Sequence, residues 1–191
     1  MFKDCIDPGH AGQNIDPGAK NQVTGLQEAD VNLAVSKLVA HYLDAAGHQV
    51  TLTRTELEQP ETDSLQYRCD VSNNWGADVF ISLHCNAATP AAKGFEVWTS
   101  PGQTQGDRLA TCIYNQITRE FPDRVGRTDY SDGDPDKESK FYVLTQTNAP
   151  ACLVEMAFIS NAEEAALLAN STWRDRMARA IARGITDFHS Q

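Results

Sequence analysis

The chain has 191 residues, of which 41% are hydrophobic, and its formal net charge is −10 at pH 7. This length favours a single domain over residues 1–191, with a monomer as the default expectation. The negative charge and the lack of Lys and Arg clusters argue against a nucleic-acid partner. Apolar runs such as Val79–Leu83 are far shorter than the roughly 20 residues that cross a bilayer, and the acidic start at Asp4 does not fit a signal peptide.

The cysteines are odd in number, form no CxxC pair and lie mostly in apolar segments. This pattern is typical of reduced residues that pack like small hydrophobes, and it disfavours zinc-thiolate ligation. We therefore expect five buried free thiols, at Cys5, Cys69, Cys85, Cys112 and Cys152.

A strand, a long loop and a helix are predicted at the start of the chain. Phe2–Asp7 is a strand candidate closed by a Pro-Gly pair, and a loop rich in Gly, Asn and Asp follows it. From Glu28 to Leu43 apolar residues recur at helical spacing, and Gly47 stands where a helix C-cap is expected. Gln49–Thr53 alternates polar and apolar residues, which predicts a second strand.

The middle of the chain contains the most apolar strand candidate. Asp63 is predicted to cap a helix that ends before Gly76. The run Val79–His84 comes next, and a nearly continuous apolar strand after a helix is typical of a central parallel strand covered on both faces. Phe95–Thr99 is predicted to be a strand and Leu109–Phe121 a helix.

The last third begins with an acidic segment. Pro122–Glu138 contains several Asp residues and few apolar ones, which predicts a surface loop whose role stays open. Phe141–Leu144 and Ala151–Glu155 are predicted strands. Asn161 begins a short helix with a polar start signal, and Trp173–Phe188 has the apolar spacing of a terminal amphipathic helix.

The alternation of these elements predicts an α/β fold with a twisted, mostly parallel sheet of about six strands flanked by about five to six helices. Ligands bind such sheets at the carboxyl ends of the strands. His10 follows the first strand, His84 ends the central strand and Glu155 ends the last one. Glu28 begins the first long helix on the same edge. We therefore expect two imidazoles and two carboxylates to meet at one rim.

This set of side chains suits metal-assisted hydrolysis. Two His and one Glu leave the fourth position of a tetrahedral zinc ion open for water, and a second carboxylate nearby can take the proton of that water. No compact motif such as HExxH is present, so ordinary interpretations stay open as well. His10 could be a polar loop residue, Glu28 a helix-start acid favoured by the macrodipole, and His84 an imidazole satisfied by a neighbour. Glu155 lies among apolar residues, where an unpaired carboxylate is costly, and this favours function.

The other histidines lie on or beside predicted helix ends, and we expect them to be solvated: His41, His48 and His189.

Several short motifs follow one another along the chain. They are Asp7–Gly12 with Asp16–Ala19, Glu28–Leu33, Leu52–Arg54, Ser64–Arg68, Ser82–Ala87, and Pro150–Glu155 with Phe158–Asn161. Together they resemble the motifs of the zinc-dependent N-acetylmuramoyl-L-alanine amidases of the amidase-3 family, over nearly the whole chain. The resemblance implies that His10, Glu28 and His84 bind one Zn²⁺ per chain and that Glu155 is the catalytic residue.

The implied activity is hydrolysis of the amide bond between N-acetylmuramic acid and L-alanine in bacterial peptidoglycan. Peptidoglycan or muropeptides would then be the partner, and the enzyme would act at the bacterial cell wall, periplasmic or extracellular, as an autolysin or endolysin. Asn86 and Arg68 could bind the glycopeptide, although Arg68 could equally be a structural ion-pair partner. Two alternatives stay open: a zinc hydrolase of another peptidoglycan amide, and a non-catalytic cell-wall-binding module.

Overall fold

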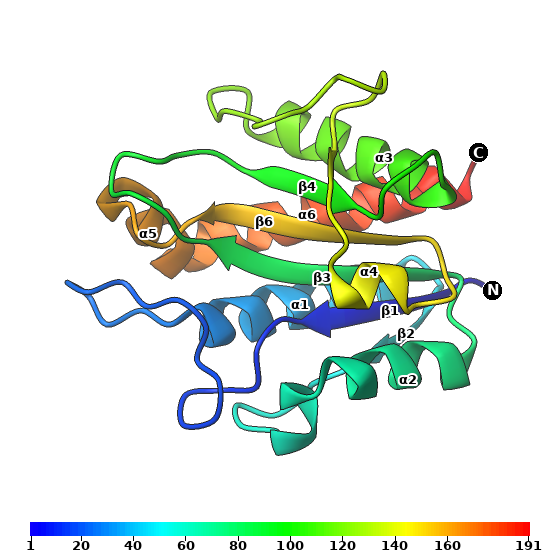
Figure 1. Cartoon of the computed structure of the whole chain (residues 1–191), viewed down its shortest axis with the longest axis horizontal. Coiled ribbons are helices and arrows are strands. Elements are labelled where there is room, and N and C mark those ends of the chain that lie inside the picture. Colours follow the sequence, from blue (N-terminus) through cyan, green and yellow to red (C-terminus); the bar gives the residue numbers. More distant parts are fainter.

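Six strands form one sheet in the order β2-β1-β3-β6-β4-β5 in the computed structural model, which describes residues 1–191 (Figure 1). The strands are β1 (Lys3–Pro8), β2 (Gln49–Leu52), β3 (Val79–Asn86), β4 (Glu96–Thr99), β5 (Lys137–Glu138) and β6 (Ala151–Phe158). Every neighbouring pair is parallel except β4 with β6. The predicted mostly parallel sheet is therefore confirmed.

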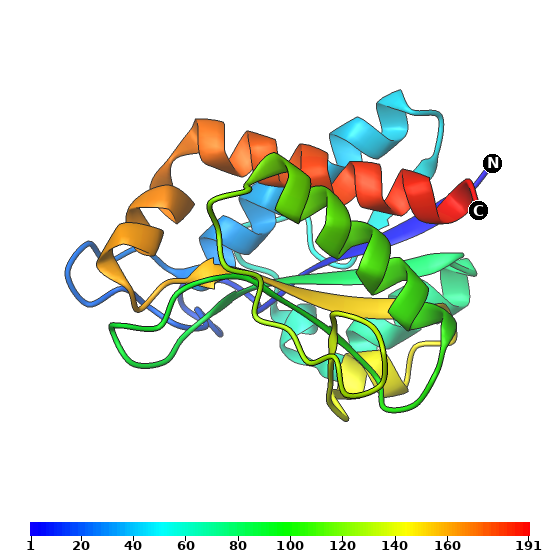
Figure 2. The same ribbon diagram turned by 90° about the horizontal axis from the view of Figure 1, so that it is seen from above.

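Helices cover both faces of this sheet. They are α1 (Glu28–Ala45), the 3-10 turn η1 (Pro60–Asp63), α2 (Leu65–Trp75), α3 (Gln105–Glu120), α4 (Tyr142–Thr145), α5 (Ala162–Ala169) and α6 (Ser171–His189). α1, α3 and α6 pack together on one face, whereas α2 and α4 lie on the other (Figure 1 and Figure 2). None of the helices combines the length and the apolar composition that crossing a bilayer requires.

The central position of β3 explains why the stretch Val79–Leu83 is almost entirely apolar. Ile81 and Leu83 face the larger cluster of core residues, built with α1, α3 and α6, whereas Phe80 packs in a smaller cluster on the α2 and α4 face. Both faces of β3 are thus withdrawn from water, as in other covered parallel sheets. All five cysteines are buried and unpaired, as the sequence predicts.

Two predicted elements are wrong in detail. Phe141–Leu144 is not a strand, because Tyr142–Thr145 forms one helical turn, α4. A run of four apolar residues is too short to distinguish a period of 2 from one of 3.6. The cap of α2 is Ser64, whose side chain accepts a hydrogen bond from the backbone of Tyr67, whereas Asp63 lies in η1.

The acidic segment Pro122–Glu138 is for most of its length a surface loop, as predicted, but it is tied to the sheet at two places. The backbone N–H of Arg127 donates to the carbonyl of Phe95, and Lys137–Glu138 pairs with β4 as β5. Asp136 is only 2% exposed and accepts a hydrogen bond from β4. The segment therefore covers the edge of β4 instead of projecting into solvent along its whole length.

Candidate metal and catalytic site

His10 follows β1 in a tight turn and has a φ of 66°, a left-handed conformation that is uncommon for any residue except glycine. Two buried guanidinium groups hold this turn. Arg68 donates to the carbonyl oxygens of Pro8 and His10 at 2.8 and 2.7 Å, and Arg54 donates to that of Gly9 at 3.3 Å. The turn is fixed from both sides, so the imidazole of His10 is directed to the rim of the sheet.

Glu28, the first residue of α1, joins the two histidines. Its Oε1 lies 3.1 Å from Nε2 of His10 and 2.9 Å from Nδ1 of His84. The backbone N–H groups of Ala19 and Cys85 also donate to this carboxylate, at 2.8 and 3.0 Å. Burial alone would raise the pKa of Glu28, but the hydrogen bonds and charges of the two imidazoles outweigh it and hold that pKa well below its usual value. The carboxylate is therefore ionised at neutral pH.

Asp16 orients the ring of His10 from its other side. Its Oδ2 lies 2.7 Å from Nδ1 of His10, which leaves Nε2 directed toward Glu28. Burial lowers the pKa of His10, but Glu28 and Asp16 outweigh it and raise that pKa to about 8. The sequence places Asp16 in the first motif but does not predict its contact with His10. The only indication in the sequence is that this carboxylate lies in the same loop as a candidate ligand.

Two glycines make room for this arrangement. A Cβ atom on Gly9 would lie 2.3 Å from the ring of His84, and one on Gly18 would lie 2.5 Å from Cδ2 of His10 and 2.7 Å from Oε2 of Glu28. No other residue fits at either position without displacing a candidate ligand.

The donor set fits a zinc ion. His10, Glu28 and His84 each offer one ligand atom, and these three atoms lie within 4.8 Å of one another. Two imidazole nitrogens and one carboxylate oxygen are ligands that Zn²⁺ accepts, and three protein ligands are typical of hydrolytic sites with one open position. The structure thus brings together the three residues that the sequence predicts as ligands.

Glu155 lies beside this cluster on β6, opposite His84 of β3 and Glu96 of β4. Its Oε2 is buried and has no hydrogen-bond partner. Burial raises the pKa of Glu155 to about 7, the charges of Glu28 and Glu96 add to the rise, and the two imidazoles oppose it. A free carboxylate oxygen with a pKa near neutrality suits a group that first takes and then returns a proton.

The two predicted substrate-binding residues have different surroundings. Asn86 ends β3, and its amide donates to Oε2 of Glu96 at 3.0 Å. Arg68 is 2% exposed, and besides holding the turn at His10 it pairs with Asp7 at 2.6 Å. These contacts favour the structural interpretation of Arg68. Binding of the glycopeptide stays a prediction for both residues.

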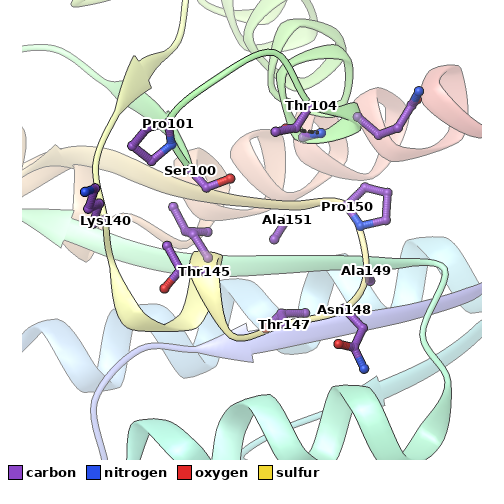
Figure 3. Close-up of a pocket in the computed structure, with 13 residues that line it drawn as sticks. Ser100, Pro101, Thr104, Lys140, Thr145, Thr147, Asn148, Ala149, Pro150 and Ala151 are labelled. Carbon is purple, nitrogen blue, oxygen red and sulfur yellow. Dashed lines mark hydrogen bonds between the residues drawn. The ribbon is translucent and has the colours of Figure 1, made fainter.

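A cavity of about 270 Å³ opens over the site, between the rim of the sheet and α4. Its lining includes His10, Asp16, His84, Glu155, Phe141 and Tyr142. A wider hollow of about 560 Å³ lies beside the amino end of β6 and is lined by residues such as Thr104, Lys140, Thr145 and Pro150 (Figure 3). This second hollow contains no imidazole or carboxylate, so it offers no comparable chemistry.

Known proteins are similar to this chain over nearly its whole length. Residues 5–187 match the family model described as N-acetylmuramoyl-L-alanine amidase. The chain is 35% identical over 187 residues to the N-acetylmuramoyl-L-alanine amidase CwlM of Bacillus licheniformis, covering 97% of this chain and 68% of that protein. It is 32% identical over 189 residues to an endolysin of Bacillus phage SPP1, covering 95% of this chain and 64% of that protein.

Solved structures share the fold over the full length. The N-acetylmuramoyl-L-alanine amidase AmiC2 of Nostoc punctiforme superposes with a TM-score of 0.86 at 31% identity, covering 100% of this chain and 98% of that one. An N-acetylmuramoyl-L-alanine amidase from Clostridium difficile 630 gives 0.87 at 29% identity, with coverage of 100% and 97%.

Proposed function

Because the chain belongs to the amidase-3 family of N-acetylmuramoyl-L-alanine amidases, we propose that His10, Glu28 and His84 bind Zn²⁺ and that Glu155 is the catalytic base. The activity is that of the family, hydrolysis of the amide bond between N-acetylmuramic acid and L-alanine in peptidoglycan. The observation that carries the assignment of roles is the meeting of three metal-ligand atoms with the unpartnered Oε2 of Glu155 at one rim.

Each residue of the site has its own role in hydrolysis. Zinc, when bound, supplies a Lewis acid that polarises the amide carbonyl and acidifies a water molecule. Glu155 takes a proton at Oε2 from the water that attacks the carbonyl carbon, and returns it to the departing alanine nitrogen. Asp16 keeps the ring of His10 in the orientation that ligation requires. The products are the lactyl carboxylic acid and the free amine of the peptide.

Peptidoglycan or its muropeptides are the proposed substrate, and the bacterial cell wall, on the periplasmic or extracellular side, is the proposed place of action. Two named relatives, an endolysin and a sporulation-specific amidase, belong to different biological settings. A lytic role of autolysin or endolysin type is therefore proposed without a choice between the two. All four site residues come from one chain, so the chemistry requires no more than a monomer.

The decisive experiment compares the unchanged protein with Glu155→Gln. We expect the variant to keep its zinc content and to lose hydrolysis of purified peptidoglycan by at least about 100-fold, because it lacks the base. His41→Gln, at an exposed position on α1, is the matched control and should keep both properties. Loss of zinc together with activity would mean that Glu155 is a ligand or a fold element, and the assignment of the base would be wrong.

Product analysis tests which bond is cut. Release of free L-alanine amino groups without new reducing ends is the expected result. New amino groups on any other residue would point to a zinc hydrolase of a different peptidoglycan amide. Sedimentation with cell walls without any cleavage would point to a non-catalytic binding module.

A further inference from the structure

A second cluster of metal-ligand side chains lies at the opposite edge of the sheet. Asp4 is at the start of β1, His48 precedes β2 and His189 ends α6. The sequence predicts that both histidines are solvated, and the structure contradicts this: His48 is 8% exposed and the side chain of His189 is 5% exposed. Their burial follows from Asp4, a partner that is distant in the sequence and lies between the two rings.

The cluster resembles the proposed zinc site of the same chain in composition and geometry. Nδ1 of His48 lies 2.6 Å and Nε2 of His189 lies 2.7 Å from the carboxylate of Asp4. The two ring centroids are 5.4 Å apart at 66°, compared with 5.0 Å and 74° for His10 and His84. In each cluster the three ligand atoms lie within 4.8 Å of one another. The proposed zinc site therefore serves as an internal reference for the second one.

The charge of this cluster favours a cation. Asp4 is fully buried, and neither Lys nor Arg forms an ion pair with it. Its two hydrogen-bond partners are imidazoles, and an imidazole nitrogen is also a common metal ligand. A buried carboxylate is costly without a compensating positive charge. Phe2 shields the cluster further, since its ring stacks on that of His189 with centroids 4.0 Å apart.

We propose that Asp4, His48 and His189 form a second binding site for a divalent cation of the zinc type. Two imidazole nitrogens and one carboxylate suit Zn²⁺ better than the oxygen-binding cations Ca²⁺ and Mg²⁺. The cation would connect the first strand, the segment before β2 and the last turn of α6. Its role is structural, because the cluster lies at the amino end of β1 whereas the catalytic rim lies at the carboxyl end.

Metal counting tests the proposal. The protein is stripped with a chelator, reloaded with Zn²⁺ and analysed for bound metal per chain. We expect two equivalents in the unchanged protein and one in a His10→Ala/His84→Ala variant, because the second site does not use either residue. Adding His189→Gln to that variant should remove the remaining equivalent, whereas adding His41→Gln should not, since His41 is exposed and outside both clusters.

Thermal unfolding gives a second measurement. Zinc at a hundredfold excess over its Kd should raise the Tm of the His10→Ala/His84→Ala variant by roughly 5 °C or more, and should leave the Tm of the triple variant unchanged. The single variant His189→Gln should still cleave peptidoglycan, which shows that it folds. One equivalent of zinc in the unchanged protein and none in His10→Ala/His84→Ala would overturn the proposal. Asp4, His48 and His189 would then only connect their three segments by hydrogen bonds. This count does not depend on whether any His189 variant folds.

Discussion

Asp16 and Glu28 contact opposite nitrogens of one imidazole: Oδ2 of Asp16 lies 2.7 Å from Nδ1 of His10, and Oε1 of Glu28 lies 3.1 Å from its Nε2. Asp16 therefore determines which nitrogen is free to bind a metal. Because the loop 11–27 supplies it, the ligand and its orienting partner come from one continuous stretch of chain.

Replacing Asp16 with Ala should weaken zinc binding about 10- to 100-fold, because the ring of His10 loses the partner that fixes its tautomer. Competition with a zinc chelator measures the affinity. Asp44→Ala is the control, since Asp44 is an exposed acid on α1 that makes no contact with an imidazole. Equal affinity in the Asp16 variant and the control would contradict the proposed orienting role.

Gly18→Ala should disrupt the proposed zinc site, because the added Cβ would lie 2.5 Å from His10 and 2.7 Å from Glu28. Gly25→Ala is a matched control in the same loop: its φ of +75° is close to the +65° of Gly18, but its nearest neighbour would be 3.9 Å away. Both variants carry similar backbone strain, and only Gly18→Ala should lose zinc and activity. If both bind zinc equally well, close packing at Gly18 does not matter for the site.

Arg68→Met should destabilise the fold by about 3–5 kcal/mol, because it leaves the buried carboxylate of Asp7 without its ionic partner. Denaturant unfolding measures this loss. In the fraction that stays folded, loss of the contacts with Pro8 and His10 should lower kcat, whereas KM for muropeptides should change little. Normal stability with a raised KM would instead support the prediction that Arg68 binds the glycopeptide.

Asp134 and Asp136, two acidic residues near β4, should make the free energy of unfolding depend on pH. Burial raises the pKa of Asp136 to about 8, and the neighbouring carboxyl group of Asp134 adds to the rise. A folded-state pKa above the unfolded value of 3.8 means that the folded protein binds the extra proton. The contribution of Asp136 to the free energy of unfolding is complete below about pH 4 and is lost as the pH rises toward 8.

Asp136→Asn isolates this effect, since it keeps the shape and cannot titrate. The unfolding midpoint of the unchanged protein should fall relative to that of the variant between pH 5 and pH 8. Parallel curves for the two proteins would show that Asp136 titrates normally.

That the candidate site residues meet at one rim could be predicted, because they obey a rule of topology. His10 follows β1, whereas His84 and Glu155 lie in the carboxyl halves of β3 and β6, which continue to Asn86 and Phe158 beyond the predicted strand ends. Sequence alone identifies these strands, and parallel strands bring their carboxyl ends to one rim. The supporting residues could not be predicted in the same way. The contacts of Arg54 and Gly18 with the site depend on the path of loops, for which periodicity gives no signal.

The incorrect expectations have equally physical causes. His48 and His189 lie next to predicted helix ends, which suggested that both rings are solvated. Both instead contact Asp4, which is 44 and 185 residues away from them in the chain, so no local pattern predicts their burial. Phe141–Leu144 satisfies the apolar pattern of a strand, and tertiary packing makes it a helical turn. The two residues of β5 are too few to produce any pattern.

Both ends of the chain lie on the same side of the molecule, at the amino edge of β1 (Figure 1 and Figure 2). The contact between the rings of Phe2 and His189 fixes this arrangement. An attachment made through either end would thus leave the rim that holds the proposed site pointing away from its support. The domain could be immobilised on a bead or a sensor surface by either end, and a large insoluble polymer would still reach the rim.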